Sequence, residues 1–166
     1  MFSLRTFLAA LLVSALSLSA FAGAPKGGKA PHFVLPDASG QLVSLKDFRG
    51  QALVVHFWAT WCPYCKKVQP GLQALADKHA GQGLVLIGIS FREDDGAAPQ
   101  AVLESRGHQF TTLVEGDEVA EMYGVRGTPT TVFINARGTV VGATHTSDPA
   151  DPILERLAGE ALGIAQ

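Results

Sequence analysis

The chain has 166 residues, of which 47% are hydrophobic and 17% are charged, and its formal net charge is −2. This length and composition are typical of a single globular domain with an ordinary core. A slightly acidic chain has no basic footprint for nucleic acid, so we exclude the nucleic-acid-binding class.

The first 22 residues have the pattern of a secretory signal peptide. Arg5 provides a positive amino end, residues 6–19 are uncharged and rich in Leu and Ala, and Ala20 and Ala22 are the small residues that a signal peptidase reads. We therefore expect export and cleavage after Ala22. An uncleaved membrane anchor is the alternative, because the uncharged stretch is long enough for a marginal span.

Residues 23–30 are rich in Gly, Pro and Lys and are expected to form a flexible segment before a domain that covers 31–166. Two short apolar runs, 31–37 and 41–45, flank a turn and indicate a β-hairpin. The stretch 52–58 (ALVVHFW) is apolar apart from one histidine, which is typical of a buried strand.

The only two cysteines follow this strand in the sequence Trp61-Cys62-Pro63-Tyr64-Cys65. Apolar residues at helical spacing come next, so we expect Cys62 near the N-terminus of a helix that ends at about residue 79. Free N–H groups and the positive end of the helix dipole stabilise a thiolate there. The pattern predicts dithiol–disulfide exchange, with Cys62 as nucleophile and Cys65 as the resolving thiol.

Two structural interpretations of the cysteine pair are weaker. A disulfide that closes a two-residue loop constrains the unfolded chain very little. Half of a zinc site would need a second Cys pair, or histidines at finger spacing, and the sequence has neither.

The rest of the chain alternates strands and helices. After a buried strand at 84–90, we expect helices at 97–106, at 117–123 with Asp117 as its cap, and at 152–162, and strands at 110–114, 127–134 and 139–144. The unit 52–90 should be a right-handed, parallel βαβ unit. Pro129 opens a strand, where its missing N–H lies outside the ladder.

The segment 57–66 (FWATWCPYCK) resembles the active site of the thioredoxin superfamily. The opening 31–45 and the GTPTTVFI segment at 127–134 narrow the resemblance to exported TlpA/ResA-like thiol–disulfide oxidoreductases. The resemblance implies an α/β thioredoxin fold: a mixed central sheet flanked by helices, with an N-terminal β-hairpin and a central insertion. It also implies a cis peptide bond before Pro129, which should lie against the cysteines, and a substrate segment bound by the backbone of Thr128.

Residues around the cysteines are expected to shape the site. Trp61 should flank the nucleophile and form part of a partner surface, and Pro63 and Tyr64 should tune the stability of the thiolate. The acidic run 93–95 is expected to be solvated. The histidines other than residue 56 are expected at the surface; they are His32, His79, His108 and His145.

His56 lies six residues before Cys62, where thioredoxins carry a buried acid. It is either a satisfied core histidine or the base that takes the proton of Cys65 as this thiol attacks a mixed disulfide. The glutamate that ResA-like reductases tend to carry three residues after the second cysteine is replaced here by Val68.

The resemblance implies a periplasmic reductant that needs no cofactor or metal. Its partners would be client proteins with disulfides, among them apocytochrome c during cytochrome c maturation, and a membrane electron-donor protein of the thiol-reducing pathway. Three alternatives are a DsbA-like disulfide oxidase, a peroxiredoxin-type peroxidase and a copper-handling module that uses soft ligands.

Overall fold

A computed structural model describes residues 25–164. The signal sequence predicted at 1–22 lies outside these residues, so its cleavage or anchoring stays a prediction. Within the described part of the chain, no helix is both long and apolar enough to span a bilayer.

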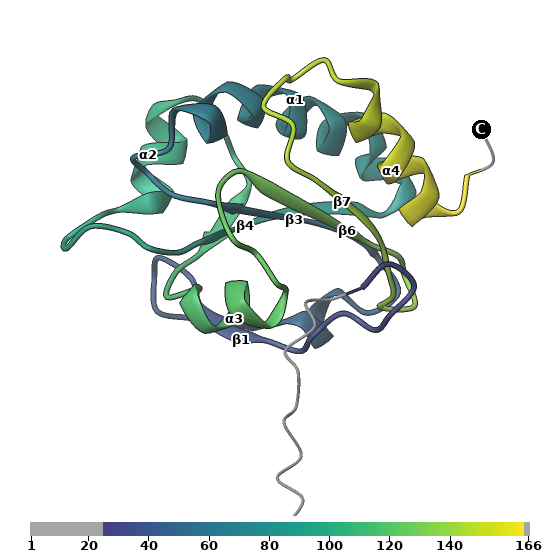
Figure 1. The fold of residues 1–166 in the computed structure, drawn as a ribbon, viewed down its shortest axis with the longest axis horizontal. Coiled ribbons are helices and arrows are strands. Elements are labelled where there is room, and N and C mark those ends of the chain that lie inside the picture. Colours follow the sequence, from purple (N-terminus) through teal and green to yellow (C-terminus); the bar gives the residue numbers. More distant parts are fainter. Residues whose placement is uncertain (1–24, 165–166) are drawn as a thin grey trace, which may run out of the picture.

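The structure consists of a five-stranded sheet with helices on both faces and a two-stranded hairpin (Figure 1). The strands are β1 (Val34–Pro36), β2 (Leu42–Ser44), β3 (Ala52–Trp58), β4 (Leu84–Ser90), β5 (Thr111–Leu113), β6 (Thr130–Ile134) and β7 (Val140–Thr144). The helices are α1 (Pro63–His79), α2 (Pro99–Ser105), α3 (Asp117–Met122) and α4 (Pro152–Leu162), with 3-10 turns η1 (Leu45–Phe48) and η2 (Ala80–Gln82). This arrangement confirms the predicted fold class and the N-terminal hairpin.

Strand β3 is central in the order β5-β4-β3-β6-β7. It runs parallel to β4 and antiparallel to β6, so the sheet is mixed and the predicted parallel pairing within 52–90 is confirmed. His56 lies in the middle of the sheet, opposite Gly88 on one side and Thr131 on the other.

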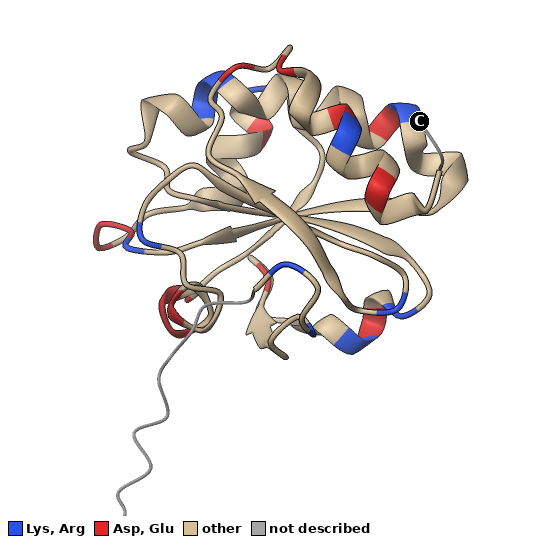
Figure 2. Cartoon of the chain, turned by 45° about the vertical axis from the view of Figure 1, so that its right-hand side comes forward, with Lys and Arg blue, Asp and Glu red and all other residues tan. Residues whose placement is uncertain are grey.

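Side chains of β3 enter two separate cores, because successive residues of a strand point to opposite faces. Val54 and Trp58 pack with α1 and α4, whereas Val55 and Phe57 pack with α3 and the hairpin on the other face (Figure 1). The described strands carry no Asp, Glu, Lys or Arg, and these residues lie on helices and loops around the sheet (Figure 2). By the same alternation, His56 faces α1 and the cysteines.

Gly71 allows α1 to approach the segment that leads into α4. A Cβ atom at Gly71 would lie 2.2 Å from the carbonyl oxygen of Pro149, far inside van der Waals contact. The helix also contains Pro70, yet it continues to His79. A glycine in mid-helix is ordinarily unfavourable, so its presence here indicates that close packing sets the position of α1.

The predictions for Asp117, His79 and His108 were wrong. Asp117 is the first helical residue of α3 rather than its cap, and its carboxylate accepts a hydrogen bond from the backbone N–H of Arg92 at 3.2 Å. His79 and His108 are buried, with 6% and 8% of their surface exposed. His79 Nε2 contacts a carboxylate oxygen of Glu155 on α4 at 2.8 Å, which explains why this ring faces inward.

Candidate active site

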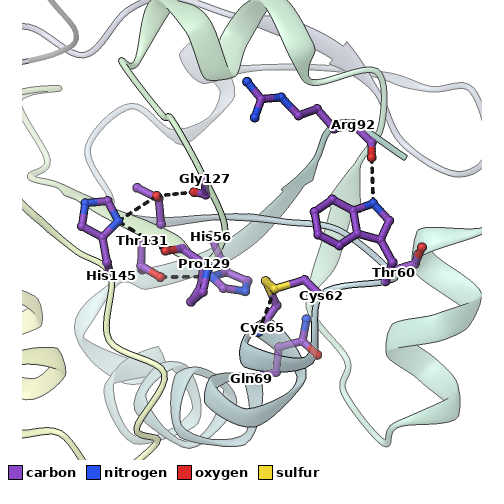
Figure 3. The surroundings of a disulfide bond; sticks show 12 residues. His56, Thr60, Cys62, Cys65, Gln69, Arg92, Gly127, Pro129, Thr131 and His145 are labelled. Atoms are coloured by element: carbon purple, nitrogen blue, oxygen red, sulfur yellow. Dashed lines mark hydrogen bonds between the residues drawn. A yellow bond between two sulfur atoms is a disulfide. The ribbon is translucent and has the colours of Figure 1, made fainter. Parts of the chain in front are cut away.

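The two cysteines form a disulfide at the junction between β3 and α1 (Figure 3). Cys62 is the N-cap of α1, and its Sγ accepts a hydrogen bond from the backbone N–H of Cys65 at 3.1 Å. The exposed fraction is 2% for Cys62 and 0% for Cys65. When the disulfide opens, this N–H and the positive helix end can stabilise a thiolate on Cys62.

Two large aromatic side chains are exposed beside the disulfide. Trp61 is 52% exposed and Tyr64 is 62% exposed. The indole N–H of Trp61 donates to the carbonyl oxygen of Arg92 at 2.8 Å, which holds the ring in place (Figure 3). The placement suits the partner surface predicted for Trp61, which stays a prediction, as does the tuning role of Pro63 and Tyr64.

The loop before β6 lies next to the disulfide. The Thr128–Pro129 peptide bond is cis, as expected, and Pro129 is buried beside the cysteines (Figure 3). Thr128 is half-buried, and its backbone N–H and C=O have no hydrogen-bond partner within residues 25–164. Such a backbone can pair with an extended segment of another protein.

His56 is completely buried under the disulfide (Figure 3). Its Nδ1 lies 3.0 Å from the hydroxyl oxygen of Thr131, and its Nε2 has no hydrogen-bond partner among the described residues. Burial lowers the pKa of His56 to about 3, so the imidazole is neutral at physiological pH. The site therefore holds a neutral ring on the same face as Cys65.

A network of side chains far apart in the sequence fixes Thr60, two residues before Cys62. The carboxylate of Glu93 accepts hydrogen bonds from the backbone N–H of Thr60, at 3.0 and 3.1 Å, and from its hydroxyl at 2.6 Å. Arg106 donates to the carbonyl of Thr60 and to Oε1 of Gln69, both at 3.0 Å. Glu93 therefore belongs to the hydrogen-bond network that holds Thr60 and is not the solvated residue we expected.

Replacing Glu93 with Ala is expected to reduce the free energy of unfolding by about 1–3 kcal/mol, because the backbone N–H of Thr60 loses its partner. Glu93→Gln keeps an acceptor oxygen and should lose less. The neighbouring exposed Asp94→Ala is the control, expected to stay within about 0.5 kcal/mol of wild type. Urea unfolding of the oxidised proteins measures all three, and equal losses for the two alanine variants would contradict the assignment.

Sequence reasoning missed four other residues that the fold brings to the site. Thr131 contacts His56, and Gln69, which accepts a hydrogen bond from Arg106, lies beside the cysteines (Figure 3). His145 Nδ1 lies 3.0 Å from the Thr130 hydroxyl and 3.3 Å from the Pro129 carbonyl (Figure 3). Only Gln69 left a signal in the sequence: it is a polar residue one helical turn after Cys65 on the apolar face of α1.

Metal ligands do not converge in the described part of the chain. No group of three or more His, Cys, Asp or Glu side chains in residues 25–164 is placed to hold a metal ion. The chemistry available here is that of the two sulfurs, the neutral ring of His56 and the amide of Gln69.

Comparison with known proteins relates this chain to proteins of thiol–disulfide exchange. The AhpC/TSA family matches residues 26–143. Thiol-disulfide oxidoreductase ResA of Halalkalibacterium halodurans is 30% identical over 130 residues, 78% of this chain and 73% of the relative. ResA of Bacillus subtilis is 32% identical over 146 residues, 83% and 81% of the two chains. A Chlorobium tepidum crystal structure described as a thiol:disulfide interchange protein DsbE aligns with a TM-score of 0.75 and 30% identity, covering 85% of this chain and all of that one.

Proposed function

Since the chain belongs to the AhpC/TSA family and is a ResA-like thiol–disulfide oxidoreductase, we propose that it reduces disulfides in exported client proteins. The observation that supports this best is the N-cap position of Cys62 beside the unpaired backbone of Thr128. A client segment can lie along Thr128 and Pro129 and present its disulfide to Cys62.

The reaction proceeds by two thiol–disulfide exchanges. The Cys62 thiolate attacks one sulfur of the client disulfide, an S–S bond forms between the two proteins, and the other client sulfur leaves as a thiolate. Cys65 then loses its proton and attacks Sγ of Cys62, which closes the Cys62–Cys65 disulfide and releases the second client sulfur as a thiolate. The two client thiolates take up protons, and two electrons have passed to the client.

His56 is proposed to assist the second step. Its neutral ring lies on the α1 face of the sheet, and a thiolate developing on Cys65 would favour a proton on the imidazole. Because the pKa of His56 is about 3 in the disulfide form, this ring binds a proton only while that negative charge is beside it. Thr131 positions the ring through its contact with Nδ1.

The proposed location is the periplasm, reached through the signal sequence predicted at 1–22. A membrane electron-donor protein would reduce the Cys62–Cys65 disulfide again after each turnover. Clients would include apocytochrome c, whose haem-binding cysteines must be reduced during cytochrome c maturation. The N-terminal sequence pattern supports the export, and the resemblance to exported TlpA/ResA-like proteins supports this choice of donor and client.

The alternatives differ in direction or in chemistry. A DsbA-like oxidase would use the same residues with the electron flow reversed. A peroxidase would need only the first cysteine, whereas here the buried Cys65 lies within bonding distance of Cys62. A copper-handling module would need further soft ligands, and among residues 25–164 no third His or Cys joins the pair in a metal-binding group.

The equilibrium reduction potential of the Cys62–Cys65 pair tests the direction. We expect a value well below about −200 mV, measured in defined thiol buffers by Trp fluorescence. A value near about −120 mV would make the protein an oxidase on the same fold and would overturn the proposal.

A further inference from the structure

The side-chain amide of Gln69 is fixed in orientation. Gln69 is fully buried on α1, and its Oε1 accepts a hydrogen bond from Nη1 of Arg106 at 3.0 Å. A guanidinium group has only donors, so the oxygen of the amide must face Arg106 and the NH2 group must face away from it. Figure 3 shows this NH2 end on the side of the cysteine pair.

The NH2 group of Gln69 has no hydrogen-bond partner among the described residues. Buried polar groups almost always have one, so an unpaired donor beside two reacting sulfurs requires an explanation. Gln69 follows Cys65 by four residues, and side chains at this helical spacing are neighbours. In the disulfide, however, Sγ of Cys65 is uncharged and bonded to Cys62, which makes it a poor acceptor.

We propose that Nε2 of Gln69 donates a hydrogen bond to Sγ of Cys65 once the disulfide opens, and so stabilises the Cys65 thiolate that resolves the mixed disulfide. The inference rests on the exchange reaction proposed above. A thiolate is a charged acceptor, and hydrogen bonds to charged groups are stronger than those between neutral groups. Gln69 therefore stabilises the reduced and mixed-disulfide states more than the oxidised state.

Arg106 is a positioning residue in this arrangement. Its Nη2 donates to the carbonyl of Thr60 at 3.0 Å, and its guanidinium lies 5.7 Å from the ring centre of Trp58. The group that orients the amide of Gln69 is thus attached to the loop that leads into Cys62. This attachment keeps the donor directed at Cys65 while the bond between the sulfurs breaks and forms.

Gln69→Met is the first test, since it keeps the length of the side chain and removes the donor. Measured in a Cys62→Ser background, where only one thiol titrates, the pKa of Cys65 should rise by about one unit. With both cysteines present, a tenfold shift toward the disulfide would lower the potential by about 30 mV. Release of client from the mixed disulfide should slow about threefold at neutral pH, because a less acidic thiol is also a better nucleophile once ionised. Raising the pH should restore the rate.

Gln69→Glu tests whether this side chain faces Cys65 while its contact with Arg106 is kept. Glutamate has the same shape and keeps the acceptor for Arg106, but it replaces the donor with a charged oxygen. The pKa of Cys65 should therefore rise further than in Gln69→Met, because the donor is lost and the carboxylate also repels the thiolate. Gln73→Glu is the control for the added charge. It places the charge one turn beyond Gln69 on α1, where the side chain of residue 73 contacts Gln109 and Asp77, and should leave the pKa of Cys65 unchanged.

A Cys65 pKa equal to wild type in Gln69→Met would overturn this inference, whatever the charge in Gln69→Glu does. The exchange reaction itself would stand in that case, provided the wild-type protein still reduces a client disulfide through Cys62. If the wild-type protein reduces no disulfide, the proposed function fails first. The two failures are therefore distinguishable in one set of proteins.

Discussion

Cys62→Ser is expected to lower the rate of disulfide reduction by at least about three orders of magnitude. A serine hydroxyl is not ionised at neutral pH, and neither the helix N-terminus nor the N–H of Cys65 can make it a nucleophile toward sulfur. Cys65→Ser should keep the first attack, because the Cys62 thiolate and its surroundings remain. The reaction then stops at the mixed disulfide, and the client stays covalently bound.

Insulin reduction followed by turbidity measures the loss, and non-reducing gels with mass spectrometry detect the trapped client. Each variant is the control for the other, because both remove one sulfur from the same buried site. Wild-type insulin reduction by Cys62→Ser would show that the mechanism is wrong. Trapping by Cys62→Ser but not by Cys65→Ser would exchange the roles of the two cysteines, against the N-cap position of Cys62.

The fold could be predicted where its signals are local. The strands at 52–58 and 84–90 are apolar apart from His56 and Ser90, and the helix at 152–162 repeats its apolar residues at helical spacing. The predicted bounds of these three elements match the structure. The turn between the hairpin strands could be predicted for the same reason, because its signal lies in adjacent residues. Resemblance, rather than physics, gave the cis bond before Pro129, because composition carries no information on that isomer.

The hydrogen-bond network around Thr60 and Gln69 could not be predicted, because its contacts join distant parts of the chain. Glu93 reaches Thr60 across 33 residues, and Arg106 reaches Gln69 across 37. Each of these residues is an ordinary polar residue in its own stretch of sequence. Only the packing of α1 and the 91–106 segment on the same face of the sheet brings them into one network. The burial of His79 could not be predicted for the same reason, since its partner Glu155 is 76 residues away.

His56 should make the protein progressively less stable as the pH falls below about 6.5. In the unfolded chain this histidine takes up a proton at its ordinary pKa, about 6.5. In the folded protein burial keeps the pKa of His56 near 3, so the unfolded state binds one more proton between these values. The free energy of unfolding then decreases by up to about 1.4 kcal/mol for each pH unit, or roughly 2–3 kcal/mol between pH 6.5 and 4.5.

Other groups act mainly outside this window. Hydrogen bonds, above all to Ser39, lower the pKa of the Asp37 carboxyl, and bonds to Ile153 and Lys78 do the same for Asp151 and Glu155. Stability from these carboxylates is lost only below about pH 4.5, where the unfolded chain begins to protonate them. His108 is the exception: burial, and next the charge of Arg106, lower its pKa, so it acts within the window of His56 and with the same sign.

Urea unfolding of the oxidised protein at intervals from pH 7.5 to 4.5 measures the slope. His56→Gln should reduce the slope of unfolding free energy against pH by up to about 1.4 kcal/mol per pH unit, which corresponds to one proton, because glutamine does not titrate. Thr131→Val is the matched control: it removes the contact with Nδ1 but keeps the imidazole, so it should lower stability at every pH and keep the wild-type slope. If wild type and His56→Gln instead lose stability in parallel, the folded state also binds a proton at His56. The ring would then be an accessible base even in the disulfide form, and its proton affinity would not depend on the charge of Cys65.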